Sequence, residues 1–324
     1  MDIYVKKAII HQFSPDDTDL YLADKFLNIT PKIEEYLRKK IERVYSDEAR
    51  TGIFEEDNPF LEMISDDLLE TSVAVANRWK EEFVVSENQK TNDLVFIQFS
   101  KEGVDHFAFL RIALRETLTH LGGEVDNPIK PTQNNLPGFG TGADEALVIN
   151  LQSRKYHLIE KRIKYNGTFL NYFSENLLQA QPKISPKKSI KALEKTAQKI
   201  AESFNTDDFQ FQSKVKSAIF NHIEEENKLS PEKLADDLFD DNLTARLSFI
   251  DQVKEAVPEP VTFEEIDASR QLKKFENQKL SLSNGIELIV PNNVYEDAES
   301  VEFILNDNGT YSILIKNIED IQSK

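Results

Sequence analysis

Helix caps and turn dipeptides divide this sequence into three regions of different hydrophobic period. Up to about residue 165, β-branched and aromatic runs alternate with helical patterns. Helical patterns that each open on a capping residue follow, and beyond Pro260 two Asn-Gly dipeptides lie between apolar runs. This order predicts an α+β fold with a mixed sheet-and-helix domain over residues 1–165, a helical domain over 166–257 and a small β-rich module over 263–324.

The first region opens with a predicted β-hairpin. Residues 3–13 and 20–29 form its strands, and the turn signal Ser14-Pro15-Asp16-Asp17 separates them. Thr30-Pro31 then supplies an N-cap and a first helical proline for a helix to about Tyr45. We further expect a helix over about 59–85, strands at 94–99, 107–114 and 146–151, and a loop over about 122–143.

The later regions carry clearer signals for helix starts and turns. Four helix starts are predicted after about Gly167, and a proline-containing linker ends the helical region. Asn-Gly favours two-residue hairpin turns, so two hairpins are expected near the carboxyl end. The helix starts are Ser185-Pro186, Thr206-Asp207, Ser230-Pro231 and Asn242; the linker is Val257-Pro258-Glu259-Pro260; the hairpin turns are Asn284-Gly285 and Asn308-Gly309.

Composition removes several classes of function. The 324 residues include no cysteine, which excludes disulfide frameworks, thiolate metal sites and a cysteine nucleophile. The start of the chain carries Asp2, Lys6 and Lys7 and no long apolar run, so no signal peptide is expected. No stretch is apolar enough for a membrane span. We therefore expect a cytoplasmic protein with no membrane partner.

Charge is distributed unevenly along the chain. The formal net charge is −18, yet residues 153–199 contain eleven basic and three acidic side chains, a local charge of +8. A polyanion would be attracted to this window and repelled elsewhere, which predicts one salt-sensitive contact patch. The predicted DNA-binding residues are Arg154, Lys155, Lys161, Arg162, Lys164, Lys183, Lys187, Lys188, Lys191, Lys195 and Lys199.

The second half of this window reads as an amphipathic helix. Five apolar side chains fall on one stripe of a helical wheel, and four lysines gather nearly opposite. Lysines three or four residues apart lie about 5 Å apart along the axis, comparable with roughly 7 Å between phosphates along one strand. The pattern predicts contact with the DNA backbone, largely without sequence specificity. The stripe is Ile190, Leu193, Ala197, Ile200 and Phe204; the lysines are Lys188, Lys191, Lys195 and Lys199.

Other interpretations of this helix stay open. Lysines on an exposed helix face also serve merely to keep the helix soluble. The apolar stripe would serve equally in a domain core or at the interface of a homodimer. Direct DNA binding by one patch further requires that the cations between Arg154 and Lys164 fold beside the helix, which the sequence does not show.

Four short stretches of the sequence stand out together: Ala8-Ile9-Ile10-His11-Gln12-Phe13, Arg43-Val44-Tyr45-Ser46, Gly52-Ile53-Phe54 and Asn171-Tyr172-Phe173-Ser174-Glu175. They resemble a known family, the bacterial nucleoid-associated proteins of the NdpA/YejK type (the 37-kDa nucleoid-associated protein). The similar length extends this resemblance over most of the chain, and it is weakest after about Phe263.

The resemblance implies a cytoplasmic protein that associates with the nucleoid and binds DNA, with type II topoisomerases as partners. It supplies no motif for DNA-contacting residues, so the residues named above come from charge alone. The predicted function is that of a non-catalytic, nucleoid-associated protein that binds double-stranded DNA. The strongly acidic total equally suits an alternative, an adaptor that reaches the nucleoid by docking onto a partner such as a topoisomerase.

No catalytic, metal or cofactor site is expected. The run Gly138-Phe139-Gly140-Thr141-Gly142 suggests a phosphate cradle, but the lysine and helix of a P-loop do not follow it. Acidic runs at 224–226, 236–237 and 240–241 would suit a metal-dependent nuclease only if they converged. No Ser/His/Asp arrangement stands out, and Trp79 is expected in a core. The five histidines show no metal-ligand spacing, and His222 is expected at a core or its boundary; the others are His11, His106, His120 and His157.

Overall fold

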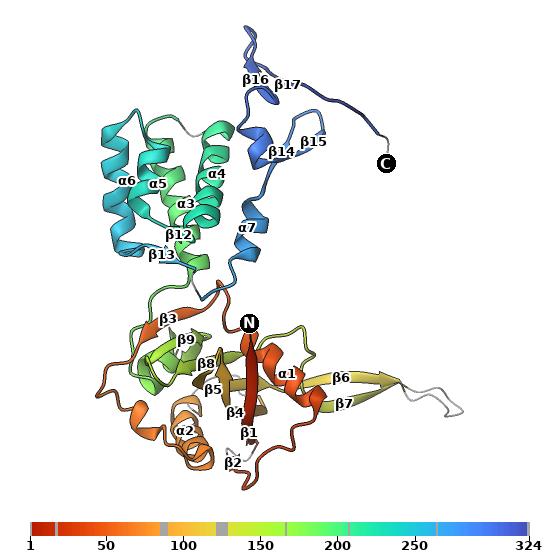
Figure 1. Ribbon diagram of the computed structural model, residues 1–324, viewed down its shortest axis with the longest axis vertical. Helices are drawn as coiled ribbons and strands as arrows, with labels where there is room; N and C mark the ends of the chain where they lie inside the picture. The colour runs from red at the N-terminus through yellow and green to blue at the C-terminus, as the bar shows by residue number, and fades with distance from the viewer. Residues whose placement is uncertain are drawn as a thin grey trace. The chain divides into compact units, whose positions relative to one another are not determined.

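The chain divides into two units, Met1–Ser185 and Pro186–Lys324, and each is described by itself (Figure 1). The computed structural model describes residues 2–16, 19–84, 90–120, 129–165, 167–206, 208–263 and 265–322. Both units contain helices and strands, so the predicted α+β class is confirmed. The division into three domains stays a prediction.

A seven-stranded antiparallel sheet forms the centre of the first unit. Its strand order is β2-β1-β4-β5-β8-β9-β3. The predicted opening hairpin is present, with Phe13 opposite Leu20, but its second strand ends at Tyr21 rather than near residue 29. The three strands expected from apolar runs are β4, β5 and β8. The bounds are β1 Ile3–Ser14, β2 Asp19–Tyr21, β3 Arg50–Ile53, β4 Asn92–Lys101, β5 Val104–Ala113, β8 Glu145–Asn150 and β9 Lys155–Ile159.

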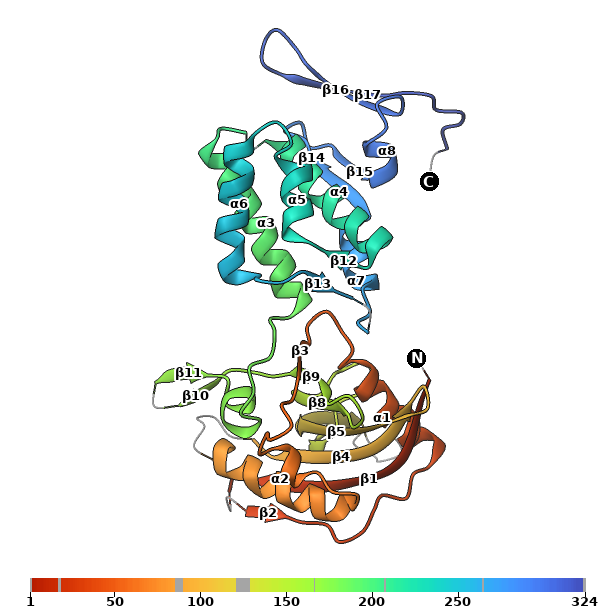
Figure 2. The ribbon, with the colours of Figure 1, turned by 60° about the vertical axis from the view of Figure 1, so that its left-hand side comes forward.

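Helices cover both faces of this sheet (Figure 2). Alternate residues of β4 enter different cores: Phe96 packs in the cluster that contains Trp79 of α2 (Leu68–Phe83), and Ile97 packs in the cluster that contains Ile41 of α1 (Pro31–Glu42). Successive side chains of a strand point to opposite faces, so α1 and α2 lie on opposite sides. Burial on both faces explains why β4 reads as a continuous apolar run rather than an alternating one.

Capping decides where these helices begin. Thr30 Oγ1 accepts a hydrogen bond from the Ile33 amide, and Pro31 is the first helical residue, as predicted. The second helix was expected from about residue 59 but begins at Leu68, because Asp67 Oδ1 accepts from the Leu69 amide at 2.9 Å and caps it there. Between residue 59 and that cap, the helical structure of the chain is a short 3-10 turn, Leu61–Met63.

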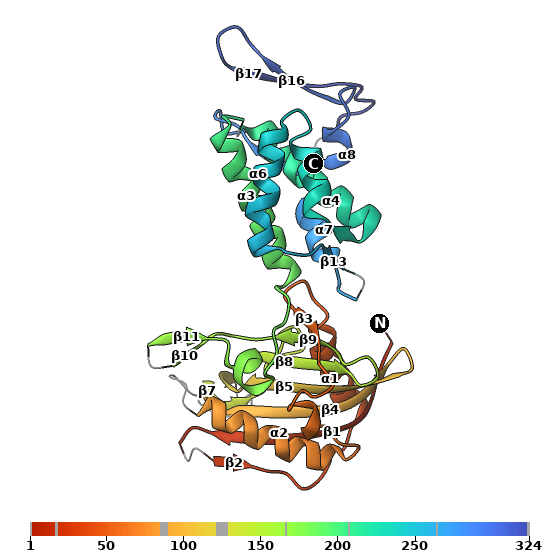
Figure 3. The same ribbon diagram turned by 90° about the vertical axis from the view of Figure 1, so that its left-hand side faces the viewer.

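The prediction of a loop over residues 122–143 is wrong in part. Residues Ile129–Asn135 form β7, which pairs with β6 (Arg115–His120); residues 121–128 lie outside the described part of the chain. The sequence did not reveal these strands because they bury almost nothing and so carry no apolar alternation. A shorter hairpin, β10 (Ile163–Tyr165) and β11 (Thr168–Leu170), leads to the π-helical turn Phe173–Leu177 (Figure 3).

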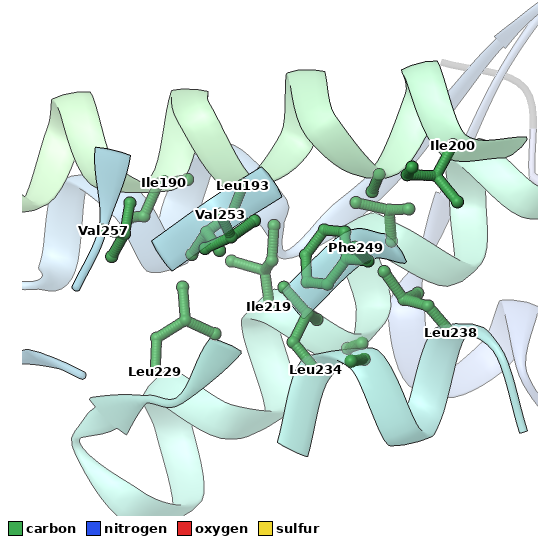
Figure 4. Packing of buried hydrophobic residues seen from close by; sticks show 14 of the residues in the cluster. Ile190, Leu193, Ile200, Ile219, Leu229, Leu234, Leu238, Phe249, Val253 and Val257 are labelled. Atoms are coloured by element: carbon green, nitrogen blue, oxygen red, sulfur yellow. The ribbon is translucent and has the colours of Figure 1, made fainter. Parts of the chain in front are cut away.

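Four helices of the second unit pack around one core (Figure 4). The predicted caps Ser230 and Asn242 are confirmed, since each side chain accepts a hydrogen bond from an amide of its own first turn. At the second predicted start the cap is Asp208, which accepts from the Phe211 amide at 2.8 Å, while Asp207 lies outside the described residues. The helices are α3 Pro186–Ser203, α4 Phe209–Glu226, α5 Pro231–Leu238 and α6 Leu243–Ala256.

Small β-elements complete the second unit. The segment expected as a linker ends α6, but its first residue, Val257, is buried in the helical core. Both Asn-Gly hairpins are confirmed, and Gly285 and Gly309 adopt positive φ of 86° and 79°. The elements are β12 Lys228–Leu229, β13 Val261–Thr262, α7 Ser269–Phe275, β14 Asn277–Ser281, β15 Glu287–Pro291, α8 Asn292–Tyr295, β16 Val301–Leu305 and β17 Tyr311–Ile315.

Candidate nucleic-acid interface

Helix α3 is amphipathic in the structure, as its sequence predicts. Ile190, Leu193 and Ile200 point into the helical core (Figure 4), and Phe204 packs partly buried against it. The opposite side carries four exposed lysines, which we call the lysine face: Lys188, Lys191, Lys195 and Lys199.

The lysine face has no countercharge. Within the described residues none of its four ammonium groups makes an ion pair or a side-chain hydrogen bond. Glu194, an acid of the same helix, is 3.1 Å from Lys274 Nζ of α7 and is already engaged. Lys187, on the first turn of α3, is exposed but has an interaction within the protein, so it is not counted with the lysine face. The four ammonium groups of the lysine face are available to bind phosphate oxygens.

The predicted cations of the first unit are held differently. Arg154 pairs with Glu56 at 3.0 Å, and Lys161 Nζ lies 2.6 Å from Asp144 Oδ1. Arg162 is exposed and makes no ion pair with any described residue. Lys155 opens β9, and Lys164 lies in β10. Carboxylates therefore already neutralise part of this group.

The boundary between the two units falls inside the basic window, after Ser185. Six of the eleven predicted residues belong to the first unit, the last of them being Lys183, whose amide donates to the Thr51 carbonyl at 2.7 Å. The other five, from Lys187 onward, are brought together on α3. That all eleven form one patch stays a prediction.

The glycine-rich run does not present a phosphate cradle. Its carbonyl oxygens surround the buried ammonium of Lys40, at 2.9 Å from Gly138 O and 2.5 Å from Thr141 O, with Pro137 O at 3.3 Å. Burial lowers the pKa of Lys40 to about 8, with further contributions from Arg43 and then Arg115, while Asp144 opposes the shift. The loop binds a cation of its own chain, so the carbonyls and not the amides point inward.

A buried polar network joins the strands of the first unit to its helices. Arg111 Nε donates to Glu145 Oε2 at 2.6 Å, and the Tyr172 hydroxyl donates to the same oxygen. Trp79 Nε1 donates to the Tyr172 hydroxyl at 3.0 Å, which confirms the expected core position of Trp79. Burial and the Glu145 carboxylate raise the pKa of Tyr172, so the hydroxyl keeps its proton. This network is structural.

Several acids of the acidic runs pair with nearby cations. Asp236 pairs with Arg246, and Glu226 pairs with Lys233. His222 lies at the edge of the core, as expected, and its Nε2 is 2.7 Å from Asp237 Oδ2. Across the described ranges, no three histidine or carboxylate side chains are grouped to hold a metal ion. In the same ranges, no helix is both long and apolar enough to cross a membrane.

Comparison with known families tests the family resemblance of the four sequence stretches. The profile of the family described as nucleoid-associated protein YejK matches residues 9–321. The chain belongs to this family. No curated protein matches it.

The stretches that resemble the YejK family have structural roles in the first unit. Tyr172 and Phe173 are fully buried. A Cβ atom on Gly52 would lie 2.3 Å from the Tyr156 hydroxyl, so only glycine fits beside that ring. His11 Nδ1 accepts from the Ala23 amide at 3.0 Å and links β1 to the segment after β2. These residues pack and hydrogen-bond within the first unit.

Two cations that the charge window did not include also lie near one another. Arg43 ends α1 and Arg115 begins β6; both are exposed, and both act on the pKa of Lys40. A count of local charge could not group them because they lie far apart in sequence. The only sequence signal was the place of Arg43 in one of the family stretches.

Proposed function

We propose that this member of the YejK family binds double-stranded DNA directly, through the lysine face of α3 and largely without sequence specificity. One observation carries the proposal: four lysines lie exposed on one helix face and, in the described chain, lack partners. Lysine is a point charge that suits phosphate oxygens, whereas reading base edges requires groups placed in a groove.

The acidic chain makes this contact local and salt-dependent. With a net charge of −18, most of the molecule repels DNA, and affinity depends on the counterions that the lysine face releases. Four phosphate contacts would contribute about 3.6 to the slope of log affinity against log salt concentration. The first-unit cations add less, because Arg154 and Lys161 already have carboxylate partners. We assign the protein no catalytic step.

Binding of a labelled duplex measured against salt concentration tests the proposal. The first variant changes all four lysines of the lysine face to Glu, and we expect it to flatten the slope by about 3.6. The matched control changes to Glu four other exposed lysines that make no ion pair with any described residue. It alters net charge equally, so we expect its slope to match the parent. Equal slopes for both variants would remove the lysine face from the function. The control lysines are Lys25, Lys32, Lys90 and Lys279.

An adaptor role is the second candidate, and the carboxyl-terminal hairpin favours it. Leu305, Tyr311 and Ile315 of β16 and β17 share one face of the hairpin and are 63%, 51% and 47% exposed, which is typical of a protein-docking surface. The partner in this case is a type II topoisomerase or a second copy of the chain. Sedimentation of the purified protein, alone and with the topoisomerase, would detect either complex, and an adaptor should leave duplex mobility unchanged.

A further inference from the structure

The hairpin β6–β7 extends away from the sheet of the first unit (Figure 1) and buries almost none of its side chains. We call its described residues, Arg115–His120 and Ile129–Asn135, the arm. Strand pairing alone stabilises an isolated hairpin poorly in water. An exposed two-stranded ribbon of this kind therefore needs an explanation in terms of what it contacts.

The two faces of the arm differ in chemistry. Leu118 lies opposite Pro131, and His120 lies opposite Ile129, so these four share one face. Leu118 and Ile129 are 72% and 64% exposed. The other face is polar, and Thr119 Oγ1 lies 3.0 Å from Thr132 Oγ1 across the strands. Its members are Thr117, Thr119, Lys130 and Thr132.

The root of the arm is positively charged. Arg115 begins β6. Arg43 lies beside the glycine-rich run that encloses Lys40, since a Cβ atom on Gly142 would be 3.8 Å from Arg43 Cδ, and both arginines contribute to lowering the pKa of Lys40. Neither arginine makes an ion pair with any residue that the structure describes. Asp144, the nearby acid, accepts from Lys161 Nζ and from the Ala113 amide and is fully engaged.

These features match the requirements of duplex DNA. The major groove of B-DNA admits a two-stranded β-ribbon, and some β-ribbon proteins use the minor groove. Leucine, isoleucine and proline side chains act as wedges that enter between base steps and kink the duplex, while arginine binds phosphates bidentately. Threonine hydroxyls bind phosphates or base edges. The arm carries these groups in one ribbon with a cationic root; Glu116 is the acid on its described strands.

We propose that the arm enters a groove of duplex DNA, with Arg43 and Arg115 binding the backbone at its root and Leu118 and Ile129 wedged against the bases. This inference rests on the proposed function, because it adds a second contact to a protein that already binds DNA. It concerns the first unit alone and does not involve the lysine face. It assigns the arm a role in deforming the duplex, which backbone contacts by lysines do not require.

Two variants separate the root from the wedge. For R43A with R115A, we expect the slope of log affinity against log salt to flatten by about 1.8, since two phosphate contacts are lost. For L118S with I129S, we expect an unchanged slope but a loss of the protein-induced bend, measured by energy transfer between dyes at the two ends of a duplex of about 25 base pairs. Trp79 fluorescence verifies that the first unit stays folded, because Trp79 is the only tryptophan and is buried there.

The chain offers matched controls. Ile289 on β15 is 65% exposed, close to Ile129, so I289S tests whether any exposed isoleucine affects bending. K279A removes an exposed cation from β14. We expect both to behave as the parent.

The outcomes distinguish the two proposals. If the parent protein does not bind duplex DNA, the proposed function fails and this inference fails with it. If the parent binds and the lysine-face variant loses slope while both arm variants match the parent, the inference alone is overturned. It is also overturned if the arm variants change self-association in sedimentation but not DNA binding, because the arm would then contact protein.

Discussion

Three cations of the first unit and the lysine face of helix α3 have opposite environments. In the first unit, Arg111 is buried against Glu145, Arg50 pairs with the nearly buried Glu160, and Lys40 is enclosed by backbone carbonyls. On α3, the lysine face is exposed and, among the described residues, unpaired. A charge count weighs all of these cations equally, yet the three first-unit cations are engaged within the protein, whereas the lysine face is available to a ligand.

Pairing and burial, rather than charge density, therefore identify a binding surface. A buried ion pair is costly to form, but it is more costly to break, because the remaining charge cannot be hydrated. An exposed row of like charges behaves in the opposite way: it contributes nothing to folding and attracts counterions. The two regions should therefore respond oppositely to substitution.

The largest expected effect is at the buried pair. Replacing Arg111 by Met leaves the Glu145 carboxylate without its cation in a site where it is fully buried, and we expect the free energy of unfolding of the first unit to fall by about 3–5 kcal/mol. Urea denaturation followed by Trp79 fluorescence measures it.

The control for this change is Arg154→Met. Its partner Glu56 is 84% exposed, so we expect the free energy of unfolding to change by less than about 0.5 kcal/mol. If R111M lowered the free energy of unfolding as little as R154M, the division between structural and available cations would lose its energetic basis.

Sequence patterns predicted the elements that bury apolar surface or carry caps. The strands β4 and β5, the caps Thr30 and Ser230 and the hairpins at Gly285 and Gly309 followed from local residues, because each depends on neighbours within a few positions. The amphipathic character of α3 followed from its periodicity in the same way.

The elements that were not predicted depend on contacts distant in sequence. Strands β3 and β9 were missed, although Gly52 lies opposite Tyr156 in the sheet, because neither strand has a strong local pattern. The neutralisation of Lys161 by Asp144, and the proximity of Arg43 to Arg115, likewise arise only when the sheet forms. A linear charge window thus found the lysine face but could not separate it from cations already engaged.

His11 of the first unit is held in its neutral form. His11 Nδ1 accepts the Ala23 amide, so the neutral ring carries its proton on Nε2 and donates it to Ser72 Oγ at 2.9 Å. Burial lowers the pKa of His11 below 6.5. The unfolded chain therefore binds a proton that the folded chain does not, and stability should fall as the pH drops below about 6.5.

Comparison with His11→Gln isolates this contribution from the other histidines. We expect the parent to lose stability more steeply than the variant between pH 7 and pH 5.5, as measured by urea unfolding at each pH with Trp79 fluorescence. The absolute stability of H11Q is lower if the glutamine packs less well, but only the slope bears on the prediction. Parallel pH profiles would show that the pKa of His11 is the same in the folded and the unfolded chain, contrary to the prediction.

The smallest expected effect is on the lysine face itself. Lys191 and Lys195, and likewise Lys195 and Lys199, are four residues apart, and like charges at this spacing destabilise a helix by about 0.2–0.5 kcal/mol per pair. Changing all four lysines to alanine, the residue with the best helix propensity, should therefore leave the unfolding free energy unchanged or raise it by about 1 kcal/mol, most clearly at low salt. Urea unfolding followed by circular dichroism at 222 nm measures this change. A loss of stability on the scale of R111M would mean that these ammonium groups are structural, and the contrast between the two regions would fail at the surface assigned to DNA.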